Sequence, residues 1–388
     1  MTSDNTSDAS INALLAARIA AGDFPSAVYL VAEHDRIRFL DALGDAVREP
    51  ERHKATVETI YDLASLTKPL VSGLLCARLV ERGELELERA VAAYLPEFAR
   101  APQTAKINVR HLLTHTSGLP AWRPLRIATG DRRERVPDVI AATTLEYPTG
   151  TRVVYSDLGF ITLGLLLERI TGASLDDLAQ TEIFRPLELR RTFFNPERAF
   201  LTEMAACELG GNAYERGMCE AGGLADSADA TAAVWREQLI WGEVHDGNAY
   251  FLGGAAGHAG LFSTARETLR LACQFIAGRT RLLAPETCAL FRTNMTENLN
   301  EARSFAWQLA ATKDSTAGGA LAPDSFGHLG FTGTSCWIDA ARERVFILLT
   351  NRTHTRTLPF VNINGVRREF HTLAVAALEC GASGDEAI

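Results

Sequence analysis

The sequence lacks a long apolar run, and this absence argues against a transmembrane protein. No stretch of its 388 residues approaches the ~18 consecutive apolar residues that a membrane-spanning helix needs. Residues 1–23 are acidic and polar before any apolar stretch begins, whereas a secretory leader begins with basic residues followed by a continuous apolar run. We therefore expect no membrane span and a cytoplasmic location. The alternative is a periplasmic or extracellular protein whose leader has been removed.

Paired cysteine motifs and a surplus of basic residues are missing as well. The seven cysteines are odd in number and no two are spaced as Cys-x-x-Cys, which argues against a disulfide framework and against a zinc cage. Acidic residues outnumber basic ones by 48 to 39, giving a net charge of −9, so nothing indicates binding to nucleic acid or anionic lipid. We expect no cofactor and no metal, and a small molecule or a peptide as substrate. The sequence carries no signal for an oligomeric state.

What is present is a globular composition and an order of elements that predicts a protein of α-helices and β-strands. Hydrophobic residues make up 47% of the chain and charged residues 22%. Residues 84–250 show helical patterns, for example at 109–114, 158–171 and 174–183, broken by proline and glycine. Outside this region the pattern predicts a helix at 9–22, strands at 26–33, 36–43, 304–310, 327–338 and 345–350, and a closing helix at 364–379.

This order predicts how the chain is organised. Because strands at both ends flank a helical middle, the most economical fold has one antiparallel sheet assembled from both ends. We expect residues 1–75 and 256–388 to form an α/β lobe, and residues 76–255 to form a mostly helical inserted lobe. The predicted fold class is α/β (α+β), with a central antiparallel sheet flanked by helices, and the two lobes make one catalytic unit.

The sharpest local signal is Ser65-Leu66-Thr67-Lys68, at the start of a helix predicted from 65 to about 82. Residues three apart share one helix face, and a serine nucleophile needs an adjacent base. Lysine is such a base only when its pKa is lowered, and burial and the positive end of a helix both act in that direction. The Ser65 N–H is then a candidate oxyanion donor. The alternative is a serine that caps the helix beside an exposed lysine.

Two further motifs strengthen the first one. Tyr155-Ser156-Asp157 precedes the helical pattern at 158–171, and His328-Leu329-Gly330-Phe331 leads into a strand predicted at 335–338. A nucleophile on a helix, a tyrosine in a loop of the helical lobe and a glycine-bearing edge strand together form a cleft. Such a set of three motifs is typical of enzymes that recognise penicillin.

Five segments in order carry a resemblance to a known family. The chain resembles the serine β-lactamase and penicillin-binding-protein-like family, in its class C (AmpC-like) and esterase branch, and segment 244–264 is most similar to penicillin-binding protein 4B-type DD-carboxypeptidases. The resemblance implies a β-lactamase/transpeptidase-like fold and a serine hydrolase that forms an acyl-enzyme on an ester or amide. DD-peptidase-like or esterase activity ranks above β-lactamase activity. The segments are 59–70, 107–120, 147–164, 248–265 and 327–339.

The resemblance also implies roles for individual residues. Ser65 takes the place of the acylated nucleophile, Lys68 that of its general base, and Tyr155 that of the residue that shuttles a proton to the leaving group. His328-Leu329-Gly330 replaces the family's Lys-Thr-Gly, which makes the Phe331 N–H the second oxyanion donor. Gly330 is expected to let the strand approach the substrate closely.

Two departures from the family pattern affect the expected activity. Asp157 stands where the family has Asn; an ionised carboxylate cannot donate a hydrogen bond to a substrate carbonyl, and it raises the pKa of Lys68, which shifts weight to Tyr155 as the base. His328 replaces a lysine, and a neutral histidine holds a carboxylate poorly. Both argue against efficient β-lactam hydrolysis. They motivate a second hypothesis, a catalytically weak penicillin-binding or sensor protein that retains the pocket.

Three other features of the sequence bear on the site. His258 lies in the glycine-rich stretch 253–260, where the backbone can approach a ligand closely, so it is a candidate substrate contact; the alternative is a packed loop histidine. His111 and His115 have the spacing of a zinc helix but lack its glutamate, which favours a structural role. Reading Ser156 as the serine of a Ser-Asp-Asn motif is disfavoured by the leucine that follows Asp157.

Overall fold

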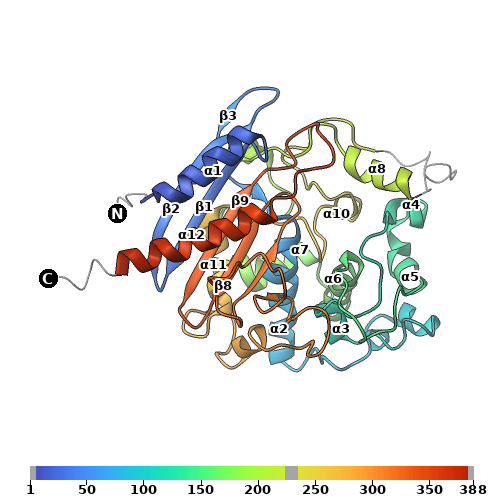
Figure 1. Cartoon of the computed structure of the whole chain (residues 1–388). Coiled ribbons are helices and arrows are strands. Elements are labelled where there is room, and N and C mark those ends of the chain that lie inside the picture. Colours follow the sequence, from blue (N-terminus) through green and yellow to red (C-terminus); the bar gives the residue numbers. More distant parts are fainter. Residues whose placement is uncertain (1–5, 223–234, 383–388) are drawn as a thin grey trace.

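The computed structural model describes residues 6–222 and 235–382. Figure 1 shows a central sheet with helices on both faces and a group of helices beside one end of it. The chain ends that the predicted α/β lobe includes, 1–5 and 383–388, lie outside the described residues, as does the part of the predicted helical lobe at 223–234.

The main sheet has seven strands in the order β3-β2-β1-β9-β8-β7-β6, with every neighbouring pair antiparallel. The pairing of β1 with β9 joins the two ends of the chain, with Ala27 opposite Thr350 and Glu33 opposite Arg344. The predicted antiparallel sheet from both chain ends is therefore confirmed, while the exact lobe limits stay a prediction. The strands are Ser26–Glu33 (β1), Arg36–Val47 (β2), His53–Lys54 (β3), Gln308–Leu309 (β6), Phe326–Leu329 (β7), Ser335–Asp339 (β8) and Arg344–Thr350 (β9).

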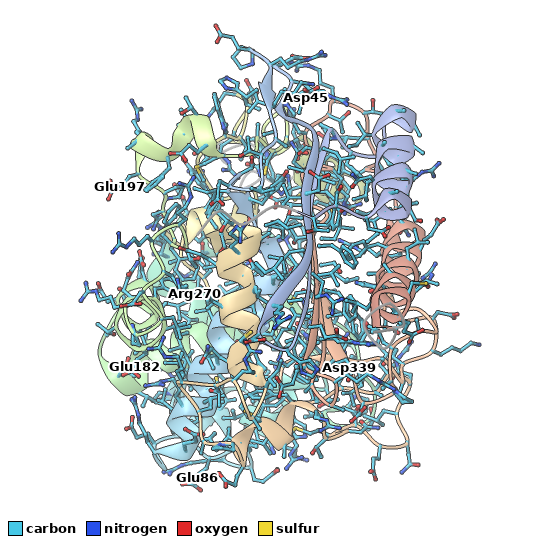
Figure 2. All side chains as sticks on the ribbon, turned by 90° about the vertical axis from the view of Figure 1, so that its left-hand side faces the viewer. Asp45, Glu86, Glu182, Glu197, Arg270 and Asp339 are labelled. Carbon is cyan, nitrogen blue, oxygen red and sulfur yellow. The ribbon has the colours of Figure 1, made fainter. Side chains whose placement is uncertain are left out.

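Both faces of the sheet are covered. On β1, Tyr29 and Val31 belong to a hydrophobic cluster with α1 (Ala9–Ala21) and α12 (Asn364–Ala382). The alternate residues Val28 and Leu30 belong to the larger cluster on the other face, which includes residues of α2 (Leu74–Glu81) and α11 (Ala265–Ala272). Figure 2 shows this layering, with α1 and α12 on one side of the strands and α11 on the other. Because side chains alternate along a strand, a central strand buried on both faces reads as a continuous apolar run.

The helical region follows α2 in the chain. Its longest helix is α6, where the Ser156 side chain accepts the N–H of Gly159 at the N-terminus. No single helix of the described ranges is long and apolar enough to cross a membrane; α6 and the segment Leu175–Phe184 meet that test only as a pair bent by 78°. The helices are Val109–Leu113 (α3), Leu125–Thr129 (α4), Val136–Ala141 (α5), Asp157–Thr171 (α6), Leu175–Ala179 (α7), Ala213–Ala221 (α8) and Gly247–Phe251 (α10).

The helix predicted from 65 to about 82 is not continuous. A 3₁₀ turn over Ala64–Leu66 is followed by a π-helical segment, Lys68–Gly73, and only then by α2. Pro69 has no N–H and so cannot close the α-helical hydrogen bond to the carbonyl four residues before it. The wider turn that results is of a kind often found at functional sites.

Two predicted strands are shorter or divided. The run 327–338 forms β7 and β8, joined by a turn in which the N–H of Gly330 donates to the Thr334 carbonyl and Gly333 has a φ of +111°. Of 304–310, only Gln308–Leu309 is strand. Ala306 has a φ of +67°, which is incompatible with extended backbone. Tight turns and positive φ values at residues other than glycine leave little trace in hydrophobic periodicity.

Candidate active site

Ser65 lies in the 3₁₀ turn and lines a cavity of about 570 Å³. The preceding residue, Ala64, has a φ of +48°, a left-handed conformation that costs a side-chain-bearing residue roughly 1–2 kcal/mol. The Asp62 carboxylate accepts the Ala64 N–H at 2.8 Å and so helps to hold this turn. Ser65 itself remains partly exposed to the cavity, as a nucleophile must be.

Lys68 is completely buried beneath Ser65, and its ammonium group has three acceptors. Nζ lies 2.9 Å from Ser65 Oγ, 3.0 Å from the His258 carbonyl oxygen and 2.7 Å from Asp157 Oδ1. The first two contacts are hydrogen bonds that the ammonium donates, and the third is an ion pair. The predicted Ser65–Lys68 contact is confirmed, and the alternative of an exposed lysine is wrong.

The charge state of Lys68 differs from the first sequence argument. Burial acts to lower the pKa of Lys68, but the carboxylate of Asp157 and the phenol of Tyr155 outweigh it, so the pKa is raised above its ordinary value. The expected lowering is therefore wrong, and the expected effect of Asp157 is confirmed in direction. Lys68 is an ammonium at neutral pH and must lose a proton before it can act as a base.

Tyr155 lies against the same lysine. The Lys68 Nζ is 4.8 Å from the centroid of the Tyr155 ring, and the ring of His115 lies 4.6 Å from that of Tyr155 on centroids. Burial raises the pKa of the Tyr155 phenol, although Lys68 and Ser65 act against the rise. The phenol is therefore protonated at neutral pH and is placed to give a proton to a leaving group. Its role as the proton shuttle stays a prediction.

The neighbouring Ser156 has a structural environment. Its hydroxyl donates to the Pro120 carbonyl at 2.7 Å and accepts the Gly159 N–H at the start of α6, and its side chain is buried. His115 Nδ1 accepts the Ser156 N–H at 3.0 Å. Both functional groups of Ser156 are thus engaged in holding the loop, which disfavours it as a catalytic serine.

Tyr155 and Ser156 give a matched pair of variants that tests this assignment. Tyr155→Phe is expected to lower kcat on a poorly activated amide by roughly 100-fold or more, because general acid–base groups contribute about 10²–10⁴-fold. Ser156→Ala is expected to keep most of the activity and to lose about 1 kcal/mol of unfolding free energy with the helix cap. Steady-state kinetics and thermal unfolding of both variants measure this. Full activity in Tyr155→Phe together with inactivity in Ser156→Ala would reverse the two roles.

The edge strand places His328 and Gly330 along the cavity wall. Burial, with the nearby positive charge of Lys68, holds the pKa of His328 well below its usual range, so this ring is neutral. A side chain at Gly330 would collide with the Thr334 hydroxyl and the Leu63 carbonyl. The close approach of Gly330 is therefore to the chain that leads into the nucleophile. Gly330 also lines the cavity, and the predicted close approach of the strand to substrate stays a prediction.

Two arginines hold the two peptide groups on either side of Phe331, the residue whose N–H is the predicted oxyanion donor. Arg367 Nη2 donates to the Gly330 carbonyl at 2.8 Å, and Arg352 Nε donates to the Phe331 carbonyl at 2.7 Å. The Gly330 carbonyl shares a peptide group with the Phe331 N–H, so a cation bonded to it polarises that N–H. Among the described residues no group accepts the Phe331 N–H. The sequence analysis missed both arginines because only the packing of β9 and α12 brings them to this turn.

His258 does not face the cavity. Its side chain is 1% exposed, and its Nε2 lies 2.8 Å from Asp246 Oδ1. The expected substrate contact by this side chain is thus wrong. Its carbonyl oxygen accepts a hydrogen bond from Lys68, so the loop positions the lysine instead.

The histidines spaced like a zinc helix have separate structural contacts. His111 Nδ1 accepts the Asn108 N–H at 3.2 Å in the capping box of α3, while His115 accepts the N–H of Ser156. The described ranges contain no group of three or more His, Cys, Asp or Glu residues arranged to hold a metal ion.

A buried carboxyl group that the sequence analysis missed lines the far wall of the cavity. Glu215, on α8, is 8% exposed and accepts the Gly247 N–H at 2.8 Å. Burial and, next, the negative charge of Asp246 raise the pKa of Glu215 to about 8. At neutral pH this group is a carboxylic acid, which can donate as well as accept a hydrogen bond.

The raised pKa predicts how stability depends on pH. Glu215 takes up a proton on folding, so its contribution is complete below the unfolded value of 4.5 and is lost as pH rises towards about 8. Glu215→Gln keeps a neutral group and removes this term. Between pH 5 and pH 8.5 we expect the Tm of wild type to fall relative to that of Glu215→Gln by several degrees. Thermal unfolding of both proteins at both pH values measures it, and a constant Tm difference would contradict the assignment.

The fold together with the buried Ser65–Lys68 pair at a cavity defines a serine hydrolase of the acyl-enzyme class. Residues 11–364 match the family described as Beta-lactamase, and the chain belongs to that family.

The chain is similar to curated proteins over most of its length. It is 31% identical over 356 residues to the "Putative D-alanyl-D-alanine carboxypeptidase" of Escherichia coli (strain K12), covering 86% of this chain and 79% of that protein. It is 32% identical over 363 residues to the "N-acetylmuramyl-L-alanine amidase" of Bacillus subtilis (strain 168), covering 87% and 79%. A solved class C beta lactamase from Rhodobacter sphaeroides has the same fold, with a TM-score of 0.69 at 19% identity, covering 96% of this chain and 100% of that one.

Proposed function

We propose that this protein hydrolyses an amide or ester through an acyl-enzyme on Ser65. The observation that carries the proposal is the 2.9 Å contact between Ser65 Oγ and the Nζ of a fully buried Lys68, at the wall of a cavity of about 570 Å³. A serine with a buried lysine at hydrogen-bonding distance is an arrangement that activates a nucleophile. The neutral His328 and the carboxylate of Asp157 disfavour β-lactams, so a peptidase or esterase activity ranks above a β-lactamase activity.

In the proposed reaction Ser65 Oγ attacks the carbonyl carbon of the substrate. The Ser65 proton passes to Lys68 after the lysine has lost one of its own protons. Tyr155 delivers a proton to the leaving group. The N–H groups of Ser65 and Phe331 receive the developing oxyanion, and each such donor is worth about 3 kcal/mol of barrier. Water then attacks the acyl-enzyme by the same route in reverse.

Peptide amides are the first substrate class to test. The printed names of the two curated relatives, a carboxypeptidase and an amidase, both describe hydrolysis of an amide bond at an alanine residue. Arg352 and Arg367 add positive charge to the cavity wall, which suits a carboxylate on a peptide and on a β-lactam alike. We expect a peptide ending in D-Ala-D-Ala to be turned over in preference to nitrocefin because of the names of these relatives.

A panel of three substrates tests the proposal. It consists of a D-Ala-D-Ala peptide, p-nitrophenyl butyrate as a simple ester and nitrocefin as a β-lactam, each assayed with wild type and with Ser65→Ala as the matched control. We expect turnover of the peptide or the ester that depends on Ser65. Nitrocefin as the best substrate would overturn the ranking, and turnover that persists in Ser65→Ala would overturn the proposal.

A catalytically weak binding or sensor protein is the second candidate. The observation in its favour is that the pKa of Lys68 is raised by its ion-pair partner Asp157, so the lysine is an ammonium with no lone pair for the Ser65 proton. A fluorescent penicillin separates the two candidates. A stoichiometric adduct that persists for hours, without turnover of any substrate in the panel, would favour the sensor.

A further inference from the structure

The Lys68 ammonium leaves the Ser65 proton without an evident acceptor. Lys68 donates to Ser65 and to the His258 carbonyl and is ion-paired with Asp157, and a fully protonated amine cannot take another proton. For Ser65 to lose its proton to Lys68, the lysine must first pass one of its own protons to another group. The first candidates are therefore the three groups within 3.0 Å of Nζ, and after them the Tyr155 phenol, which also interacts with the lysine.

Of these three groups, only Asp157 can take the proton. The His258 contact is a backbone carbonyl, which is not a base at neutral pH, and Ser65 is the nucleophile itself. Asp157 Oδ1 lies 2.7 Å from Nζ, and its side chain is 17% exposed to the cavity. Asp157 is thus the anionic group paired with the lysine, and it also borders the cavity that an incoming substrate fills.

The other titratable and charged groups around the pair are less suited. Tyr155 is a protonated phenol, and it packs on the lysine from the loop before α6. His115 and His328 are neutral rings whose pKa values are lowered by burial and by the charge of Lys68. Asp246 acts on Lys68 through space but bonds to His258, and Arg303, which acts on both histidine rings, is paired with Glu301.

We propose that Asp157 is a catalytic proton acceptor, the end of a Ser65–Lys68–Asp157 relay; this inference rests on the proposed acyl-enzyme function. The Nζ–H bond facing Asp157 breaks as an Oδ1–H bond forms, leaving a neutral amine and a carboxylic acid. Ser65 Oγ then bonds to the substrate carbonyl carbon while its proton moves to Nζ, and the carbonyl π electrons move to oxygen. On collapse the oxyanion electrons re-form the carbonyl and the bond to the leaving group breaks; Tyr155 gives the leaving group its proton and is reprotonated by Lys68, and Asp157 returns its proton to the neutral Lys68.

The burial of the pair favours this relay once substrate is bound. Holding an ammonium and a carboxylate away from water is costly, whereas the neutral amine and acid avoid that cost. Substrate that fills the cavity removes the remaining water from Asp157. The proton transfer within the pair is therefore easiest at the moment when the base is needed.

The pH dependence of kcat/KM for Asp157→Asn gives opposite signs for the two possible roles of Asp157. With a relay, Asp157→Asn removes the group that takes the lysine proton, so kcat/KM at pH 7 falls by roughly 100-fold and the acid limb, the rise of kcat/KM with pH, moves to higher pH. If Asp157 only raises the pKa of Lys68, its removal lowers that pKa, moves the limb to lower pH and preserves or increases the rate at pH 7. The second result would overturn the relay.

Two further variants complete the experiment, all assayed with p-nitrophenyl butyrate. Asp157→Glu keeps a carboxylate and is expected to keep the acid limb near that of wild type; a limb that rises as in Asp157→Asn would contradict the relay even if the Asn variant folds poorly. Asp246→Asn removes a carboxylate that acts on Lys68 without touching it, and no upward shift of the limb is expected. Labelling of wild-type Ser65 by a fluorophosphonate distinguishes failure of the two proposals. If Ser65 is not labelled, the acyl-enzyme function is wrong; if Ser65 is labelled, the pH profiles test the relay alone.

Discussion

Ser65→Ala is expected to lose turnover of ester and amide substrates by at least about 10⁴-fold. The Ser65 hydroxyl is the nucleophile of the proposed acyl-enzyme, and removing the nucleophile of comparable serine hydrolases leaves only the contributions of the oxyanion donors and of binding. The fold should be unaffected, because Ser65 Oγ contacts Lys68 and lines the cavity without bridging other elements. Steady-state kinetics with p-nitrophenyl butyrate, together with thermal unfolding, measure both parts.

Ser72→Ala provides a matched control for this prediction. Ser72 lies one to two turns further along the same segment and donates to the Gly257 carbonyl at 2.7 Å, away from the cavity. This control should lose stability of about 1 kcal/mol while its kcat changes little. Comparable losses of turnover in Ser65→Ala and Ser72→Ala would mean that the segment, rather than the Ser65 hydroxyl, is what activity requires.

Lys68→Met is expected to have two large effects at once. Methionine fills a similar volume without a donor or a base, so acylation should slow by about 10²–10⁴-fold. The buried carboxylate of Asp157 also loses its partner, and breaking a buried ion pair on one side costs about 3–5 kcal/mol of unfolding free energy. Burst-phase kinetics with an activated ester report the first effect, and denaturant unfolding reports the second.

The double variant Lys68→Met/Asp157→Asn separates these effects. Removing both charges leaves no unpaired carboxylate, so we expect most of the lost stability to return. Activity should stay low, because the base is still absent. A double variant as unstable as Lys68→Met would show that the loss comes from packing rather than from the unpaired charge, and restored activity would exclude Lys68 from proton transfer.

The sheet and the nucleophile could be predicted from the sequence because both depend on patterns among residues close together in the chain. Alternating and continuous apolar runs marked β1, β8 and β9, and the three-residue spacing placed Ser65 beside Lys68. The π-helical segment at Lys68–Gly73 could not be read in this way, because its apolar pattern is compatible with an α-helix. Only the proline signalled that the regular hydrogen-bond pattern would be interrupted.

The remaining parts of the site depend on contacts between distant segments. Arg367 reaches the Gly330 carbonyl from a helix 37 residues further along, and Glu215 reaches the cavity from α8. Neither belongs to a local motif. The charge of Lys68 also depends on a contact between distant segments. Helix position and burial predict a lowered pKa for Lys68, but the contact with Asp157 raises the pKa instead. The predicted substrate contact of His258 is wrong because a glycine-rich segment indicates that its backbone lies close to another group, without indicating whether that group is substrate or protein.

The site of covalent modification tests the central claim most directly. Wild type and Ser65→Ala are treated with a fluorophosphonate and, separately, with a fluorescent penicillin, and the adduct is located by mass spectrometry of proteolytic peptides. We predict an adduct of one probe molecule per chain on Ser65 with at least the fluorophosphonate, and none in Ser65→Ala. No adduct on Ser65 with either probe, or an adduct that persists in Ser65→Ala, would contradict an acyl-enzyme at this serine.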